Sequence, residues 1–469
     1  MNKNSSPAGA QGSDQLLGTA PIGRLILKLA LPAVAAQFIN VLYNIVDRIY
    51  IGHIPGEGDL ALTGLGICFP VILFVSAISA LVGMGGGSRA VVRMGEGKLD
   101  EANKILGNCT LLLMILGLAA TVVFQLCKEP MLYLFGATEN TIGYSMDYLN
   151  IYLYGSIFVE LALGLNFFIT SQGFSTVGMA SVIIGAVVNI VLDPILIFGL
   201  NMGVKGAALA TITAQAVSAV WVVRFLCGRR TKLRIQRRLL RLDAKVLAPV
   251  LALGLSPFIM QSTESLVNIA FNSSLKTYGG DPAVGAMTIC SSIMQVFSLL
   301  FQGLSQGAQP IVGYNYGAGQ LDRVKRTFRL LFFSSLCFSC AACAALELFP
   351  GLFVSLFNDK PELVEIAVWA LHIYAAGMFM LGVQFSCQQT FVALGQTRVS
   401  LFLALLRKVI LLIPLILLLP RFLSDQVFAV FLAEPVADIL AATTTGAIFF
   451  WRLPRILEKR RLELEHRPI

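Results

Sequence analysis

Long apolar runs alternate with short polar segments along almost the whole chain. Twelve of these runs reach about 20 residues, the length that an α-helix needs to cross a bilayer core about 30 Å thick. They cover approximately residues 25–51, 60–86, 104–127, 141–170, 177–199, 204–226, 246–276, 283–308, 325–348, 362–392, 399–419 and 426–451. The pattern predicts an all-α integral membrane protein with twelve transmembrane helices.

The two halves of the chain repeat one another at an offset of 222 residues. Residues 95–100, Gly-Glu-Gly-Lys-Leu-Asp, recur at 317–322 as Gly-Ala-Gly-Gln-Leu-Asp. The same offset pairs Gly155 with Gly377. Because six predicted spans fall in each half, we expect two pseudo-symmetric six-helix lobes with a cavity between them.

The polar segments divide the chain into two lobes, a linker and two tails. We expect an N-lobe at 21–226 and a C-lobe at 246–452. The polar tail at 1–20 is expected to be disordered, and the basic tail at 453–469 to lie in the cytoplasm. The Arg-rich linker at 227–245 is too polar for lipid, so we expect it to lie as an amphipathic segment against anionic headgroups.

Composition and charge agree with a membrane protein. The chain is 56% hydrophobic and 13% charged, against about 25% charged for soluble domains. If the N-terminus is cytoplasmic, 27 of the 35 Lys and Arg residues fall on the inner side, as the positive-inside rule requires. We therefore expect a bacterial plasma membrane protein with both termini in the cytoplasm. The net charge of +9 then reflects the bilayer surface rather than nucleic-acid binding.

Charged groups inside the spans are candidates for function, since each costs at least about 2.5–3.5 kcal/mol to insert. Six acids lie there: Asp47, Glu160, Asp193, Glu264, Glu434 and Asp438. In the first span Gln37, Asn40, Asn44 and Asp47 follow a spacing of three, four and three, which places them on one helix face. This stripe favours a water-filled cavity. The alternative, a pair between Asp47 and Arg48, is disfavoured because adjacent helix positions point in different directions.

The fifth span carries a second polar group near a proline. Asn189 and Asp193 are four residues apart and share a face, and Pro194 can free a backbone carbonyl one turn earlier. Such oxygen ligands suit Na⁺, and two neighbouring carboxylates can instead share a proton. The alternative is that Asn189 and Asp193 only hydrogen-bond a neighbouring helix. Since the equivalents in the second half are Leu411 and Leu415, we expect any ion site in the first half.

Further polar and sulfur-bearing residues are candidates for the wall of the cavity. They are Tyr43, Glu160, Asn166, Glu264, Asn268, Met294, Gln295 and Gln388. Arg407 and Lys408, inside the eleventh span, are expected to pair with Glu434 or Asp438 of the twelfth.

No sequence pattern indicates a cofactor or an enzyme. The Gly-rich stretch at 83–87 follows a long helix and lacks the Gly-Lys-Ser/Thr of a P-loop, so we interpret it as a loosened helix end. No Ser/His/Asp, paired-His or Cys/His arrangement indicates catalysis within the membrane. Transport energy is therefore expected from an ion gradient rather than from ATP.

Five segments make the chain similar to a known family. They are the first span from Leu31 to Gly52, the two Gly-x-Gly-x-Leu-Asp loops, Asn189-x-x-x-Asp193-Pro194, and Ala433-Glu-Pro-Val-Ala-Asp438. Over about residues 20–455 the chain resembles the multidrug and toxic compound extrusion (MATE) family, and within it the bacterial branch of MepA and DinF type. The resemblance implies a 6+6 fold, a V-shaped central cavity, and antiport of organic cations or other drugs against Na⁺ or H⁺.

The family's motifs also imply a cation site in the N-lobe. It would consist of Asp47, Asn189, Asp193 and the hydroxyl of Thr211, for which Thr213 is an alternative. Pro32 matches a first-helix proline proposed to bend when the site changes state. Where some members have an acid in the tenth span, this chain has Gln384, Gln388 and Gln389, which leaves Glu264 as the only acidic remnant of a C-lobe site.

Two functions follow from these patterns. The first is a monomeric, cation-coupled exporter whose aromatic and Met-rich walls suit flat apolar cations. The alternative is a flippase for lipids or lipid-linked oligosaccharides of similar architecture. A flippase would need a cationic cavity for pyrophosphate, whereas the intramembrane acids outnumber the bases six to two. The choice between H⁺ and Na⁺ stays open.

Overall fold

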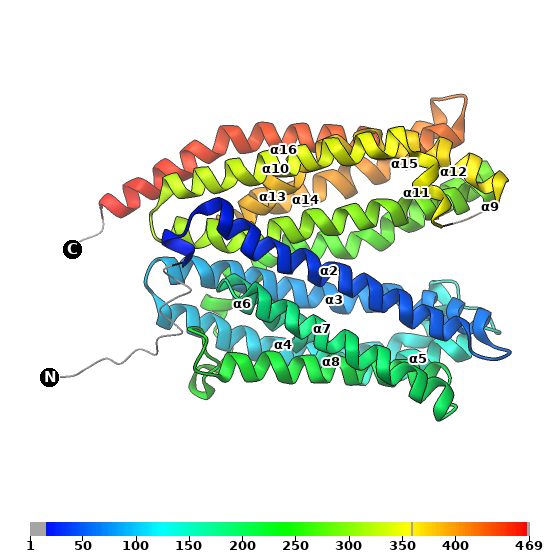
Figure 1. Ribbon diagram of the computed structural model, residues 1–469, viewed down its shortest axis with the longest axis horizontal. Helices are drawn as coiled ribbons and strands as arrows, with labels where there is room; N and C mark the ends of the chain where they lie inside the picture. The colour runs from blue at the N-terminus through cyan, green and yellow to red at the C-terminus, as the bar shows by residue number, and fades with distance from the viewer. Residues whose placement is uncertain (1–15, 358–359, 467–469) are drawn as a thin grey trace.

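The structure, a computed structural model, describes residues 16–357 and 360–466, and within them it is helical with no β-strand. Two helical bundles lie side by side and correspond to the predicted lobes (Figure 1). The N-lobe comprises α2 (Ile22–Gly52), α3 (Gly58–Gly95), α4 (Leu99–Leu134), α5 (Ile142–Tyr154), α6 (Ser156–Ser171), α7 (Ser175–Pro194) with the π-helix η1 (Ile195–Gly199), and α8 (Val204–Cys227).

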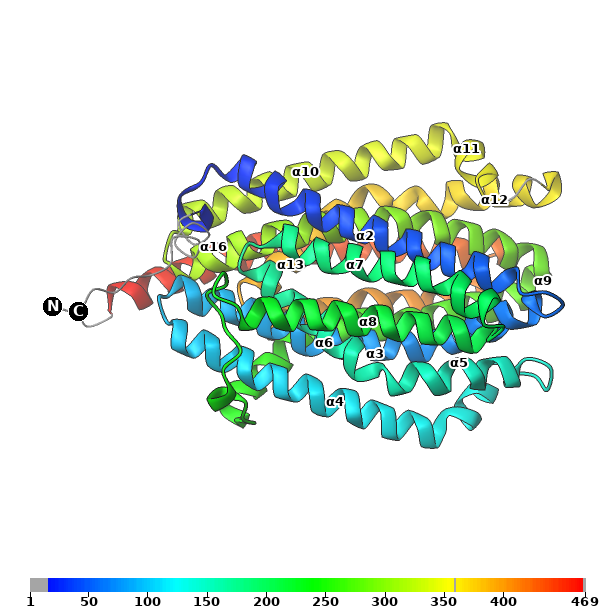
Figure 2. The same ribbon diagram turned by 60° about the horizontal axis from the view of Figure 1, so that its bottom comes forward.

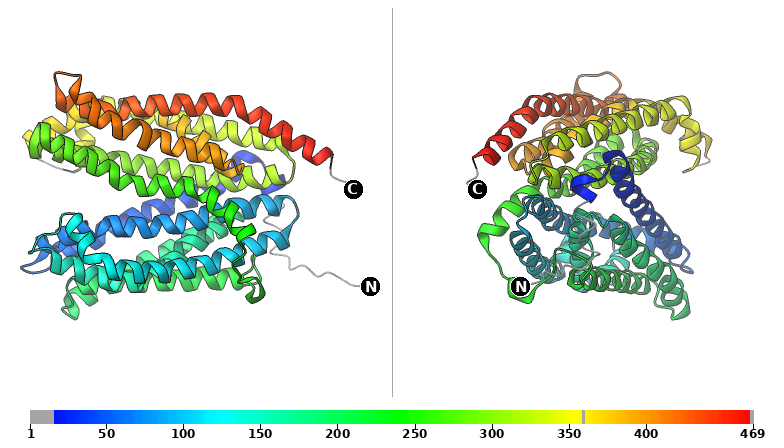
Figure 3. Two further views of the ribbon diagram at one scale, coloured as in Figure 1. Left: turned by 180° about the vertical axis from the view of Figure 1, so that it is seen from behind. Right: turned by 60° about the vertical axis from the view of Figure 1, so that its left-hand side comes forward.

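The C-lobe follows a short linker and contains the remaining helices. These are α9 (Ala244–Gly317), α10 (Leu321–Leu348), α11 (Pro350–Ser355), α12 (Pro361–Tyr374), η3 (Ala375–Met380), α13 (Leu381–Ala393), α14 (Thr397–Leu405), the π-helix η4 (Leu406–Leu412), α15 (Ile413–Leu418), η5 (Leu419–Arg421) and α16 (Gln426–Glu465). The start of α2 and the end of α16 lie at the same end of the molecule, which we call the terminal end (Figures 1 and 3).

The helices match the twelve predicted spans. Ten helices are long and apolar enough to cross a membrane, or eleven when the pair α5 and α6, bent by 58°, is counted as one. The 74-residue α9 adds one more, because Gly280 (φ 67°) breaks its helical conformation between the predicted seventh and eighth spans. The described residues therefore contain twelve spans, six in each lobe. The interruptions of the fourth and tenth spans fall at Gly155 and near Gly377, which the 222-residue offset relates.

The repeated Gly-x-Gly-x-Leu-Asp motif forms the same structure in both lobes at the terminal end. Its second glycine, Gly97 or Gly319, has a left-handed backbone with φ of 76° or 75°, which ends one helix and permits the next to begin. Its first glycine touches the other lobe. A Cβ on Gly95 would lie 2.1 Å from the Tyr314 carbonyl, and one on Gly317 would lie 2.1 Å from the Val92 carbonyl. The motif therefore closes the two lobes onto one another.

The Gly-rich stretch at 83–87 differs from its prediction as a loosened helix end. It lies inside the continuous helix α3, and a Cβ on Gly85 would lie 2.2 Å from the Val250 carbonyl of α9. Likewise a Cβ on Gly83 would lie 2.5 Å from the Gly164 carbonyl of α6. These glycines bring backbones together, as small residues do between membrane helices.

Part of each predicted tail has a defined structure. In the predicted tail at 1–20, residues 1–15 lie outside the described part of the chain, but Leu17 is buried and its carbonyl accepts hydrogen bonds from Asn315 (3.0 Å) and Arg323 (3.2 Å). At the other terminus α16 continues as helix to Glu465, beyond the end predicted for the twelfth span.

The linker at 227–245, predicted to lie as an amphipathic segment against headgroups, contacts the N-lobe. Leu233 is fully buried, and the Gln172 side-chain oxygen accepts hydrogen bonds from the Leu233 amide (3.0 Å) and the Thr231 hydroxyl (2.7 Å). Asn103 accepts from the Arg234 amide at 2.8 Å. Buried backbone groups need such partners, so these amide side chains hold the segment against α4 and α6.

Candidate functional site

The predicted cation-site residues of the first and fifth spans meet inside the N-lobe. Helices α2 and α7 run side by side (Figure 2), and they bury Asp47, Asn189 and Asp193 to exposed fractions of 7%, 1% and 0%. The carboxyl groups of Asp47 and Asp193 lie within hydrogen-bonding reach of one another. The Asn189 side-chain NH₂ donates to Asp193 Oδ1 at 3.3 Å. We call Asp47 and Asp193 the carboxyl pair.

The carboxyl pair has oxygen atoms that the protein does not satisfy. Among the described residues, no group donates a hydrogen bond to Asp47 Oδ1, Asn189 Oδ1 or Asp193 Oδ2. Two adjacent carboxylates repel one another unless a proton or another cation lies between them. Carboxylate and amide oxygens are also ligands that hard cations such as Na⁺ prefer. The arrangement can therefore hold one small positive charge.

A small pocket lies beside the carboxyl pair, between α2, α6, α7 and α8. Its volume of about 40 Å³ has room for water, since one water needs about 10–15 Å³ by this kind of measure. The polar residues that line it are Asn40, Tyr43, Asn166, Ser181, Asn189, Thr211, Gln215 and Ser218. Asn189 belongs to both the pocket and the site. Thr211, the predicted hydroxyl ligand, also lines the pocket.

The polar stripe of α2 is divided between different surroundings. Asp47 is buried, Asn40 lines the pocket, and Gln37 is half-buried. Asn44 is exposed and donates to the Asn40 carbonyl at 2.6 Å. The face that the spacing predicts is therefore exposed at Asn44 and lies inside the N-lobe at Asn40 and Asp47.

The two prolines lie at different points of their helices. Pro32 lies inside α2, which continues as one helix from Ile22 to Gly52. At Pro194 α7 ends and the π-helix η1 begins. The backbone therefore changes at the proline that follows Asp193, as the missing N–H leads one to expect.

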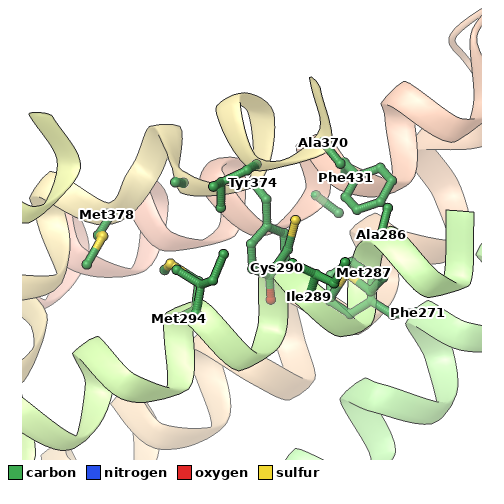
Figure 4. Packing of buried hydrophobic residues seen from close by; sticks show 14 of the residues in the cluster. Phe271, Ala286, Met287, Ile289, Cys290, Met294, Ala370, Tyr374, Met378 and Phe431 are labelled. Atoms are coloured by element: carbon green, nitrogen blue, oxygen red, sulfur yellow. The ribbon is translucent and has the colours of Figure 1, made fainter. Parts of the chain in front are cut away.

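Three residues predicted for the cavity wall lie inside the packed lobes instead. Glu160 has no exposed surface, and its Oε2 accepts a hydrogen bond from Ser79 at 2.9 Å. Met294 belongs to the apolar core of the C-lobe, beside Cys290 and Tyr374 (Figure 4). Gln388 is 2% exposed and donates to the Met260 sulfur at 3.2 Å. Hydropathy gives the depth of a residue in the span but does not identify the neighbouring helix. The structure supplies that neighbour, and each of these three side chains contacts another helix of its own lobe.

The described residues of the C-lobe include charges but no equivalent of the carboxyl pair. Arg407 donates to Asp438 (2.6 Å) and lies 3.3 Å from Glu434, as the sequence predicts. Lys408 instead forms an ion pair with Glu264 of α9. The other predicted cavity residues of α9, Asn268 and Gln295, are exposed. The acids Glu264, Glu434 and Asp438 thus each have a basic side chain nearby.

An ion pair between the lobes was not predicted. At the terminal end, the Arg460 guanidinium of α16 donates to Glu96 Oε1 at 2.7 Å and to the Gly317 carbonyl at 2.9 Å. Arg460 is 6% exposed, and the Glu96 side chain is 5% exposed. Glu96 follows α3, so the contact joins the C-lobe to the N-lobe. The only sequence signal is that Glu96 of the first motif becomes Ala318 in the second.

The Arg460–Glu96 contact should resist mild acid. Burial alone would raise the pKa of Glu96, but hydrogen bonds from Arg93 and Arg460 outweigh it and hold the pKa below its usual value. The stabilisation is therefore present above the usual glutamate value of about 4.3 and is lost only as the pH falls through the lower, folded-state value. Spin-label distances across the terminal end should stay constant from pH 7 to about pH 5. A lobe separation with its midpoint at or above about pH 4.3 would contradict this.

Comparison with known proteins agrees with the two-lobe architecture. The MatE family profile matches residues 32–195 and 257–418, once in each lobe. "Multidrug export protein MepA" of Staphylococcus haemolyticus (strain JCSC1435) is 24% identical over 422 residues, covering 90% of this chain and 92% of that protein. The protein of the same name from Staphylococcus aureus (strain NCTC 8325 / PS 47) is 23% identical over 428 residues, covering 90% and 93%.

Solved structures show the same fold. "Crystal structure of MATE in the bent conformation" matches with a TM-score of 0.90 and 21% identity, covering 96% of this chain and 99% of that one. "Outward-facing conformation of a multidrug resistance MATE family transporter of the MOP superfamily" matches with a TM-score of 0.89 and 22% identity, covering 95% and 99%.

Twelve apolar spans in two repeated lobes, with a buried acidic site in one of them, define a multi-pass membrane transporter. The chain belongs to the MatE family of multidrug efflux transporters. Members of this family are not enzymes and need no cofactor, because an ion gradient drives them.

Proposed function

We propose that this protein is an antiporter that exports organic, mostly cationic, small molecules in exchange for H⁺ or Na⁺. The observation that carries the proposal is the contact between Asp47 and Asp193, two buried carboxyl groups that need one positive charge between them. The names of the MepA relatives support the drug substrate. The hydrogen-bonding reach of the two carboxyls favours a proton, and the unsatisfied oxygens also suit Na⁺.

The terminal end corresponds to the cytoplasmic side in this proposal, since most Lys and Arg residues lie there. Several contacts close the lobes at this end. Besides the Arg460–Glu96 contact, Gln309 donates to Ser88 at 2.7 Å, and a Cβ on Gly307 would lie 2.4 Å from Ala30. The conformation is therefore closed to the cytoplasm, and we assign it to the outward-facing half of the transport cycle.

Helix α2 provides a physical connection between the ion site and the lobe interface. It carries Asp47 near one end and Ala30 near the other, 17 residues apart, which corresponds to about 25 Å of helix. Pro32 lies between them, next to the segment that contacts α9. A charge that changes the contact of Asp47 with α7 can therefore change how α2 meets the C-lobe. Coupling requires that ion and drug each bind the two conformations unequally.

Reconstituted vesicles test the proposal. With a fluorescent cationic dye as substrate, an imposed pH or Na⁺ gradient should drive dye movement, and the gradient that works identifies the coupling ion. Vesicles without protein and vesicles with collapsed gradients serve as controls. Dye movement that neither gradient changes, together with scrambling of a labelled lipid, would contradict the antiporter and support the flippase.

A further inference from the structure

The eleventh span carries two adjacent bases that contact different helices. Arg407 and Lys408 lie in the π-helix η4, a form that often marks functional positions in membrane helices. Arg407 reaches Glu434 and Asp438 on α16, whereas Lys408 reaches Glu264 on α9. The side chains of Arg407 and Lys408 are only 14% and 9% exposed. Both cations therefore lie inside the C-lobe.

The internal repeat shows what these bases replace. The offset of 222 residues relates Arg407 to Gly185 and Lys408 to Ala186. Gly185 and Ala186 both line the small pocket beside the carboxyl pair of the N-lobe. Where the N-lobe has open space next to its acids, the C-lobe thus has two cationic side chains. The N-lobe must take its cation from solution, and the C-lobe supplies its own.

The two basic residues differ in how accessible their partners are. The Asp438 side chain is 2% exposed, so its pair with Arg407 is enclosed. The Glu264 side chain is 51% exposed. It lies on α9, which runs along the side of the C-lobe that faces the N-lobe (Figure 1). A carboxylate at this depth is too costly to expose to acyl chains, so its open side faces the space between the lobes.

Lys408 also has a second acid close by. The charge of Glu434 acts on Lys408, and Glu434 Oε2 has no hydrogen-bond partner among the described residues. Glu434 is 7% exposed. If the ammonium leaves Glu264, it can turn to this oxygen and remain paired. Such an alternative matters because an unpaired buried charge costs several kcal/mol.

We propose that Lys408 is an internal ammonium that occupies Glu264 until a cationic substrate displaces it towards Glu434. The idea rests on the proposed function as a drug exporter and names the charge-selecting element of that site. One cation replaces another at Glu264, so no charge is left without a partner at either stage. A neutral molecule cannot make this exchange, and an anion is repelled by Glu264. The pair therefore selects organic cations.

Binding of two probes of similar shape tests the proposal on the purified full-length protein. Tetraphenylphosphonium is the cationic probe, and triphenylphosphine oxide is the neutral one. Lys408→Met removes the competing ammonium and should lower the Kd of the cation at least tenfold, with the Kd of the neutral probe unchanged. Glu264→Gln should raise the Kd of the cation at least tenfold and again leave the neutral probe unaffected.

Two further variants separate the proposal from a structural effect. Lys408→Arg keeps the positive charge and should not tighten binding of the cation. In the double variant Lys408→Met with Glu264→Gln, the gain from Lys408→Met should disappear, because it depends on the freed carboxylate. Equal tightening of both probes by Lys408→Met, or a gain that persists without Glu264, would overturn the proposal alone. A wild-type protein that binds no tetraphenylphosphonium would overturn the proposed function with it.

Discussion

Replacing Asp193 with asparagine should reduce ion-driven dye efflux to background, at least tenfold below the wild type, while the protein still folds and reaches the membrane. The amide keeps the size of the side chain and its place beside Asn189, but it cannot bind a proton and carries no charge for Na⁺. Asp47 then has a neutral neighbour and no longer needs to share a cation. Efflux from vesicles with an imposed gradient, normalised to the amount of folded protein, measures the effect.

Asp100→Asn is the matched control for this variant. Asp100 is exposed in the first turn of α4, and it forms no ion pair with any of the described residues. Its amide variant should keep full efflux. If the Asp193→Asn variant exports dye at the wild-type rate, the carboxyl pair is excluded as the coupling site, whatever the Asp100→Asn variant does.

Arg460→Ala should open the terminal end. The substitution leaves Glu96 with Arg93 but removes the contact across the lobes and the hydrogen bond to the Gly317 carbonyl. Breaking a buried pair typically costs about 3–5 kcal/mol, and every 1.4 kcal/mol is about a tenfold change in an equilibrium. We therefore expect the population closed at this end to fall at least tenfold relative to the open one. Spin labels at Lys98 and Lys325, on the two lobes, would report the longer distance.

Arg461→Ala provides the control at the neighbouring position. Arg461 is 60% exposed, and within the described part of the chain it pairs only with Glu458 and Glu465 of its own helix. Such exposed pairs contribute at most about 1 kcal/mol. In the Arg461→Ala variant, the distribution of distances between the spin labels at Lys98 and Lys325 should match that of the wild type. If Arg460→Ala also leaves the distribution unchanged, the Arg460–Glu96 contact does not hold the lobes together.

The helices and the repeat could be predicted because they depend on local properties. Twenty apolar residues form a span whatever surrounds them, and the motif at 95–100 recurs with the same left-handed glycine in both lobes. The spacing of Asn189 and Asp193 likewise sets their shared face. Placing Asp47 opposite them needed the family resemblance as well, since no periodicity states which helix packs against which.

The parts that could not be predicted depend on contacts between distant segments. Lys408 meets Glu264 across 144 residues of sequence and Arg460 meets Glu96 across 364, and both partners are common surface residues whose spacing carries no signal. The glycines at 83–87 were misinterpreted for the same reason. A run of small residues is equally compatible with a loose helix end and with close backbone packing until the opposing helix is known.

Counting the cations that the purified protein exchanges when it binds drug tests the central claim most directly. A pH indicator in weakly buffered, Na⁺-free solution measures protons, and a Na⁺-selective electrode in strongly buffered solution measures sodium. We predict one positive charge per protein, lost when both Asp47 and Asp193 are replaced by asparagine. Release of the same charge by that double variant would contradict the claim that these two carboxyl groups hold the coupling ion.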